Sequence, residues 1–350
     1  MDSAEIRRKK AEIEKQYGTW MVHDIQLNPD IRTRQTEIEP RALSDQEKAF
    51  CHNLDDSTWA GQSSTATRIR RIIQTIADLS RKPFDQIRVL DLGAFEGGFS
   101  VELAARGATV VAVEGRPDNL AKAQFAKEVL SLGKLELVLD DVRNVSVRNY
   151  GHFDVVLCLG LLYHLNAPDV FELAREMAEM TQEILIIETE AYAFPDESFT
   201  WHTQTYWGGN RQEHDPDATD HQKARNLLMS LNNNESFVLT RFSLIKLMQH
   251  VGCSSVYECL LPYVVGYKFR VTLAGLKRGD VGNLLTASPY DQYAEPYGEI
   301  NMERIDSEVH FWYQKVRAYQ EENRRLLSEA AGKSADSVFA KISRLLPRLR

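Results

Sequence analysis

The chain has 350 residues, 43% of them hydrophobic, which is enough for one large domain with extensions or for two modest ones. Its formal net charge of −8 at pH 7 disfavours broad binding of nucleic acids or anionic membranes through the whole surface. The four cysteines form no Cys-x-x-Cys pair, the charged first residues lack the apolar stretch typical of a signal peptide, and no run of eighteen or more apolar residues occurs. We therefore expect a cytoplasmic chain without a zinc site, a disulfide framework or a membrane-spanning helix.

The first part of the chain is predicted to be an extension of a central domain. Charged, helix-prone residues predict a helix over 4–16, and an irregular segment follows it up to residue 64. Apolar residues at helical spacing predict a second helix over 65–79, which Pro83 separates from the first strand.

Strands and helices alternate from residue 88 onward. The predicted strands are 88–92, 109–114, 135–139, 153–159 and 184–188, and the predicted helices between them are 98–106, 117–132 and 167–180. Unbroken Val, Ile and Leu strands separated by helices indicate an α/β fold, with a mostly parallel sheet that is covered by helices on both faces.

The alternation stops after Glu188. Residues 191–240 are rich in aromatic and polar side chains, and we predict an irregular insertion that forms a cap over a substrate. A helix over 243–250 and strands over 255–260 and 268–276 follow, and the last forty residues have a charged helical pattern. The predicted units are an N-terminal extension over 1–64, a central domain over 65–280 and a C-terminal extension over 281–350.

A glycine-rich turn follows the first strand and predicts a nucleotide-like ligand. Residues 91–98 read Asp-Leu-Gly-Ala-Phe-Glu-Gly-Gly, and Glu114 ends the next strand, where its carboxylate can accept both hydroxyl protons of a ribose. Phe95 takes the place of the middle glycine of a dinucleotide site, and Glu96 puts a negative charge where a pyrophosphate would lie. The Gly-Lys-Ser/Thr of a P-loop is absent. S-adenosylmethionine, which has no phosphate and carries a cationic sulfonium and ammonium, suits this turn better.

With these motifs in this order, the chain resembles the class I S-adenosylmethionine-dependent methyltransferases. The matching residues are 91–98, Glu114, the Leu-Asp-Asp-Val of 139–142 and the strand 153–160, and the resemblance covers roughly residues 68–277. It implies a Rossmann-like, doubly wound seven-stranded sheet with an antiparallel last strand, and S-adenosyl-L-methionine as the cofactor.

The resemblance also implies roles for single residues in binding the cofactor. Asp91 would lie beneath the methionine ammonium group, and Leu159 and Gly160 would present backbone to it. Glu114 would hold the ribose, and Asp141 would accept from the adenine amino group beside Val142. Gly93 and Gly97 would let backbone approach closely. The remaining candidates of this set are Ala94, Phe95 and Gly115.

Residues 161–165, Leu-Leu-Tyr-His-Leu, match a signature that occurs after the fourth strand in some methyltransferases. These include tRNA wobble-uridine carboxymethyltransferases, in which a tyrosine here helps bind a carboxylated cofactor, and enzymes of small-molecule and glycan biosynthesis. His164 and Tyr163 are therefore candidate catalytic residues, with His202 as a third. A base is needed only if the acceptor must lose a proton, and His164 can instead hold a loop by hydrogen bonds.

The insertion supplies candidates for binding the acceptor. They are Trp201, Tyr206, Trp207 and Arg211, with His23 folding over the site from the N-terminal segment beside Trp20. Self-packing of the insertion is the alternative. Glu188, Glu190, His202 and His214 match no metal motif in their spacing, so no metal is predicted.

We expect methyl transfer to a hydroxyl of a small-molecule or sugar-containing acceptor in a biosynthetic pathway. One alternative is a tRNA-modifying (carboxy)methyltransferase, which the acidic charge disfavours. Another is a non-catalytic S-adenosylmethionine-binding scaffold that assembles through its C-terminal helix. Apolar residues at helical spacing in 338–349 beside Lys and Arg fit a weak membrane contact, a partner helix of a homo-oligomer, or packing on the chain's own domain.

Overall fold

The computed structural model describes residues 1–34, 64–192, 195–259 and 270–277, together with separate helical positions between Ser307 and Arg325. The predicted C-terminal extension, apart from those positions, lies outside the described residues. None of the helices within the described ranges combines the length and the apolar character that crossing a bilayer requires.

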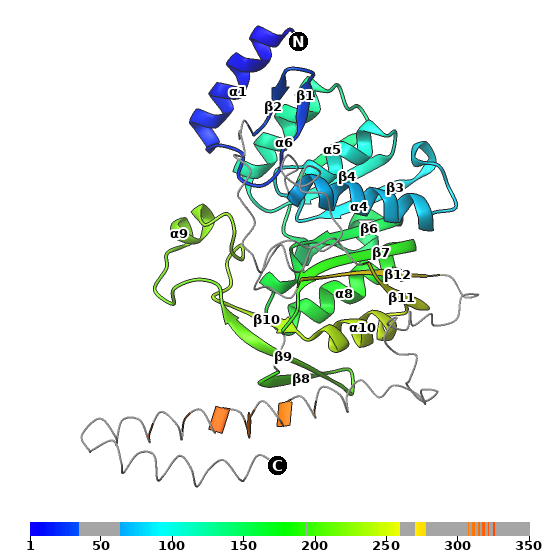
Figure 1. Cartoon of the computed structure of the whole chain (residues 1–350), viewed down its shortest axis with the longest axis vertical. Coiled ribbons are helices and arrows are strands. Elements are labelled where there is room, and N and C mark those ends of the chain that lie inside the picture. The colour runs from blue at the N-terminus through cyan, green and yellow to red at the C-terminus, as the bar shows by residue number, and fades with distance from the viewer. Residues whose placement is uncertain are drawn as a thin grey trace, which may run out of the picture.

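A seven-stranded sheet forms the centre of the molecule (Figure 1). Its strands in spatial order are β11 (Ser255–Glu258), β12 (Arg270–Leu276), β7 (Thr181–Glu190), β6 (Phe153–Leu159), β3 (Arg88–Leu92), β4 (Thr109–Glu114) and β5 (Leu135–Leu139). Strands β3 to β7 are parallel, whereas β12 runs antiparallel to both β7 and β11. The predicted doubly wound sheet with an antiparallel last strand is confirmed.

Helices cover both faces of this sheet, and each face has its own apolar core. The helices α4 (Ser64–Leu79), α5 (Gly98–Ala105) and α6 (Pro117–Val129) cover one face, and α1 (Ser3–Tyr17) packs on α6. The helices α7 (Val147–Tyr150), α8 (Asp169–Met180) and α10 (Arg241–His250) cover the other. Along β3, Val89 faces the first core while Leu90 and Leu92 face the second. Burial on both sides explains why these strands are uninterrupted apolar runs in the sequence.

The insertion after β7 contains regular structure that the sequence does not predict. Strands β8 (Glu197–Trp201), β9 (Gln204–Gln212) and β10 (Glu235–Leu239) form an antiparallel sheet in the order β10, β9, β8. Helix α9 (Asp220–Arg225) lies between β9 and β10. The smaller elements are the hairpin of β1 (Gln26–Asn28) and β2 (Ile31–Arg32) and the 3₁₀ turns η1 (Phe84–Gln86), η2 (Val142–Asn144) and η3 (Leu162–His164).

Candidate functional site

A cavity of about 220 Å³ opens where the parallel strands β3, β4 and β6 end. The carboxyl ends of neighbouring parallel strands meet at one edge of a sheet, which is where ligands bind in such folds. Ten of the predicted cofactor-binding residues line this cavity, namely Asp91, Gly93, Ala94, Phe95, Glu114, Gly115, Asp141, Val142, Leu159 and Gly160. His23, Tyr163 and His164 line it as well.

Gly97 is the predicted cofactor residue that does not line the cavity. A Cβ atom at this position would lie 2.7 Å from the Cβ of Ala123 on α6, and its φ of 79° is in the left-handed region. The glycine therefore lets α5 begin directly after the turn and pack closely on α6. Gly97 thus acts on the site by setting the course of the backbone into α5.

Two buried carboxylates face the cavity from adjacent strands. Burial and, to a smaller extent, the charge of Glu114 raise the pKa of Asp91 to about 6, against the opposing effect of the hydrogen bond that the Ser100 hydroxyl donates to Asp91. Burial also raises the pKa of Glu114, although Glu114 accepts hydrogen bonds from the backbone N–H groups of Phe95 at 2.8 Å and Arg116 at 2.9 Å. These bonds fix the Glu114 carboxylate at the cavity wall and leave oxygen lone pairs for further donors.

Asp141 stands at the end of the site where β5 leads into η2. Its Oδ1 accepts from the Arg143 backbone N–H at 3.0 Å, and its carboxylate forms an ion pair with the Arg143 side chain at 2.5 Å. Burial alone would raise the pKa of Asp141, but Arg143 outweighs it and holds the pKa below its usual range. The carboxylate thus stays ionised and able to accept a hydrogen bond.

Glu96 has a different place from the one that the sequence suggests. It is fully buried and turned away from the cavity, and it accepts from the backbone N–H groups of Met21, Val22 and His23 at 2.6 to 3.0 Å. Lys122 lies 3.3 Å from it. The expectation that its charge faces the ligand is therefore wrong, because the turn directs this side chain onto the N-terminal segment and fastens that segment beside the cavity.

His23 is brought to the cavity by this anchoring. Its Nδ1 accepts a hydrogen bond from the Gly98 backbone N–H at 2.9 Å. Burial and, to a smaller extent, the positive charges of Arg68 and Arg34 lower the pKa of His23 to about 3. His23 is therefore a neutral imidazole whose proton is on Nε2. Trp20, its neighbour in the sequence, packs instead in the core against Phe125.

His164 is held by a carboxylate that no sequence pattern identifies. Its Nδ1 lies 2.8 Å from Oε2 of Glu213, the residue that follows β9. Burial would raise the pKa of Glu213, but His164 and the donors Ser230 and Ser236 hold it below its usual value. Because an ionised carboxylate only accepts, Nδ1 of His164 carries a proton, so that Nε2 is the acceptor nitrogen of the neutral imidazole form. The two residues are 49 positions apart, so no local pattern signals the pair.

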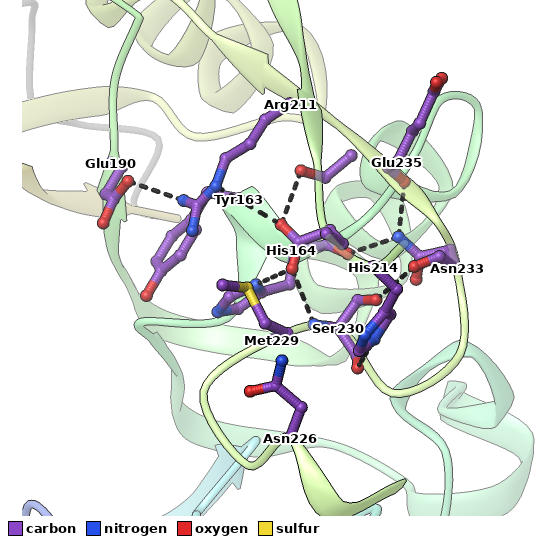
Figure 2. A network of polar contacts seen from close by, with 12 residues as sticks. Tyr163, His164, Glu190, Arg211, His214, Asn226, Met229, Ser230, Asn233 and Glu235 are labelled. Carbon is purple, nitrogen blue, oxygen red and sulfur yellow. Dashed lines mark hydrogen bonds and ion pairs between the residues drawn. The ribbon is translucent and has the colours of Figure 1, made fainter. Parts of the chain in front are cut away.

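Tyr163 lies against the same imidazole, with the ring centroids 4.1 Å apart. Its hydroxyl accepts from Arg270 at 2.9 Å, and burial raises its pKa despite that guanidinium. Tyr163 is therefore suited to donate a hydrogen bond and not to act as a base. Arg211 lies over its ring at 5.4 Å and forms an ion pair with Glu190 at 2.8 Å (Figure 2).

Five residues predicted from the insertion are not among those that line the cavity. Trp201 and Tyr206 are buried in the core beside Phe171, and Tyr206 contacts His250 through its hydroxyl at 2.5 Å. His202 lies in the turn between β8 and β9, and Trp207 packs 4.8 Å from the ring of His310. Arg211 reaches the site only through Tyr163 and the acidic residues beside it.

Charged side chains near the cavity form ion pairs with one another. Glu188 is fully buried and accepts from Arg68 and Arg270, both of which line the cavity. Among the residues that the structure describes, no group of three or more His, Cys, Asp and Glu side chains is arranged to hold a metal ion.

Part of the chain is similar in sequence to known methyltransferases. Residues 89–183 match a family described as a methyltransferase domain. The chain is 30% identical over 141 residues to magnesium-protoporphyrin O-methyltransferase of Rhodobacter capsulatus, an alignment that covers 37% of this chain and 61% of that protein. It is 27% identical over 146 residues to the O-antigen chain terminator bifunctional methyltransferase/kinase WbdD of Escherichia coli, covering 38% of this chain and 19% of that protein. The chain thus spans less than two thirds of the length of these curated relatives.

The fold has a counterpart among solved structures. The N-terminal domain of EvdMO1, crystallised in the presence of SAH and D-fucose, superposes with a TM-score of 0.55 at 22% identity. The alignment covers 79% of this chain and 98% of that domain. At this identity the similarity establishes a shared fold.

Proposed function

Because this chain carries a class I S-adenosylmethionine-dependent methyltransferase domain, we propose that it methylates a hydroxyl group of a small-molecule or sugar-containing acceptor. The observation that carries this proposal is the pair formed by His164 and Glu213 beside the cavity. An alcohol must lose its proton to become a good nucleophile, and a neutral imidazole with a free Nε2 is a suitable base.

The cavity residues fit the cofactor chemically. Bound there, S-adenosylmethionine supplies an electrophilic methyl group on a sulfonium. In our proposal Asp91 binds the ammonium group and Glu114 the ribose hydroxyls, while Asp141 accepts from the adenine amino group beside Val142. The left-handed backbone of Gly93 and Gly160, with φ of 67° and 83°, lets the chain pass close to the ligand.

The residues around His164 prepare the acceptor for attack. His164 takes the hydroxyl proton at Nε2, and Glu213 stabilises the imidazolium that results. Tyr163 orients the acceptor with its hydroxyl. The names of the relatives support an oxygen acceptor on a small or sugar-containing molecule, because one is an O-methyltransferase, one terminates O-antigen chains and the similar fold was crystallised in the presence of D-fucose.

The test begins with calorimetry of S-adenosylmethionine binding and continues with transfer of a tritiated methyl group into a metabolite extract and, separately, into tRNA. We expect His164→Ala to bind the cofactor within about twofold of wild type but to lose on the order of 10² to 10⁴ in turnover. His152→Ala is the control, since His152 is exposed before β6, at the opposite edge of the sheet.

Each negative result has a separate meaning. Absence of cofactor binding would overturn the proposed function altogether. Tritium label in tRNA but not in the metabolites would show that the acceptor is an RNA and not a small molecule. Unchanged turnover in His164→Ala would remove the base from the mechanism.

A further inference from the structure

Residues 226–233, here called the strap, join α9 to β10 and form one wall of the cavity. The strap contributes apolar side chains to the lining, among them Leu227, Met229 and Leu231. Leu231 lies at the nucleoside end, because its Cδ2 is 3.0 Å from the position that a Cβ on Gly115 would take. Gly115 follows Glu114, so the strap covers the part of the cavity assigned to the ribose.

Arg116 holds the strap from the cofactor side. One guanidinium nitrogen, Nη2, donates to the carbonyl oxygens of Asn226, Met229 and Ser230 at 3.1, 3.0 and 2.8 Å. The backbone N–H of the same arginine donates to Glu114 at 2.9 Å. A single residue thus contacts both the proposed ribose ligand and the strap.

Glu213 holds the strap from the side of the base. Its Oε2 accepts two hydrogen bonds, from Nδ1 of His164 at 2.8 Å and from the Ser230 backbone N–H at 2.7 Å. A second link runs through Asn233, whose side chain donates to the His164 carbonyl oxygen at 2.9 Å. The side chain of Glu213 is fully buried, so these donors cannot be replaced by bulk water while the strap is closed.

We propose that Glu213 is a positioning residue that couples closure of the strap over the cofactor to the orientation of the His164 base. This inference rests on the proposed function. When the strap opens, Glu213 loses the Ser230 donor and is exposed to water, and the restraint on the His164 ring is lost. The base is then aligned only while the strap encloses the cofactor.

The experiment follows both ends of the coupling without an acceptor. Protein labelled with ¹⁵N-histidine is studied by long-range ¹H–¹⁵N spectra, which distinguish the two imidazole tautomers, with and without added S-adenosylhomocysteine. Tryptic cleavage after Arg225, an exposed residue next to the strap, reports strap opening. In wild type we expect S-adenosylhomocysteine to slow this cleavage and to leave His164 in a single tautomer with its proton on Nδ1.

Two variants test the coupling from opposite ends. Glu213→Gln should speed cleavage in the bound protein on the order of tenfold and give His164 a mixed or switched tautomer. Arg116→Lys should also speed cleavage, because the lysine side chain is one bond shorter and its ammonium does not reach the three carbonyl oxygens that Nη2 of Arg116 contacts. It should disturb the His164 tautomer too, although no described contact joins Arg116 to His164. Arg116→Lys carries the test alone if Glu213→Gln does not fold.

Glu235→Gln is the matched control, since it removes one negative charge from the exposed start of β10 and should change neither readout. A single Nδ1–H tautomer in Glu213→Gln, or an unchanged His164 signal in an Arg116→Lys protein with a released strap, would overturn the coupling. Failure of wild type to bind S-adenosylhomocysteine would instead overturn the proposed function. Loss of coupling with intact binding would leave the proposed function standing.

Discussion

Asp91 is a carboxylate whose charge is unfavourable until a cation lies beside it. It is 2% exposed, and Glu114 on the next strand adds a second negative charge. Because its pKa is about 6, Asp91 in the ligand-free folded protein keeps its proton at pH values where Asp91 in the unfolded chain, with a pKa near 3.9, has released it. The contribution of Asp91 to folding is therefore fully present below about pH 4 and is lost as the pH rises through about 6.

Cofactor affinity should have the opposite dependence on pH. In the proposed function the ammonium group of S-adenosylmethionine binds the ionised form of Asp91, so we expect the dissociation constant to rise about tenfold from pH 7 to pH 5. Calorimetry across this range provides the measurement. Asp91→Asn should bind weakly with little pH dependence, and a wild-type affinity that is constant between pH 5 and 7 would separate Asp91 from the ammonium group.

The acidic residues show for which side chains the position in the site can be predicted from the sequence and for which it cannot. Asp91 and Glu114 are predictable because parallel strands bring their carboxyl ends to one edge. Glu96 is five residues from Asp91, yet its direction depends on the left-handed backbone at Phe95 and on a segment more than seventy residues earlier in the chain. Glu213 gives no sequence signal, since only the register of β9 and β10 brings it to His164.

Among the elements, the strands β3, β4, β5 and β6 have the bounds that the sequence predicts. Strands β3, β4 and β6 are mostly apolar runs that are buried on both faces, whereas β5 lies at the edge of the sheet and leaves Glu136 and Leu139 exposed. The β8 and β9 hairpin is different, because its two-residue turn is His202 and Thr203, both with positive φ, of 44° and 66°. Such turns normally carry Asn-Gly, so the usual sequence signal is absent. His202 is consequently a turn residue on the exposed edge of the small sheet.

The strain in this turn gives a test at the scale of one element. Thr203→Gly removes a β-branched residue from the left-handed region and should raise the free energy of unfolding by about 0.5–1 kcal/mol. Thr200→Gly makes the same chemical change in the exposed, extended part of β8 and should lower it by about 1 kcal/mol. Urea titration measures the free energy of unfolding of both variants. Losses of equal size would show that Thr203 is not strained.

At the scale of the whole molecule, a buried charge network connects segments that are far apart in the chain. Glu188 on β7 accepts from Arg68 on α4 at 2.6 Å and from Arg270 on β12 at 2.7 Å. The sequence places Glu188 at the end of its strand, but its partners lie 120 and 82 residues away. Because both arginines also line the cavity, the network that joins these elements is part of the wall of the site.

Removing the central carboxylate should therefore weaken the whole fold. Glu188→Gln removes the fully buried anion that Arg68 and Arg270 share, although Arg270 keeps an ion pair with Glu190 at 3.6 Å, and should lower the free energy of unfolding by about 3 kcal/mol. The control is Glu12→Gln on α1, whose ion pair with Arg8 is 61% exposed on both sides and should contribute less than about 1 kcal/mol. Urea unfolding of both variants measures the difference. A loss as small as that of the control would mean that Arg68 and Arg270 reach water without Glu188, so that the cavity wall does not depend on this network.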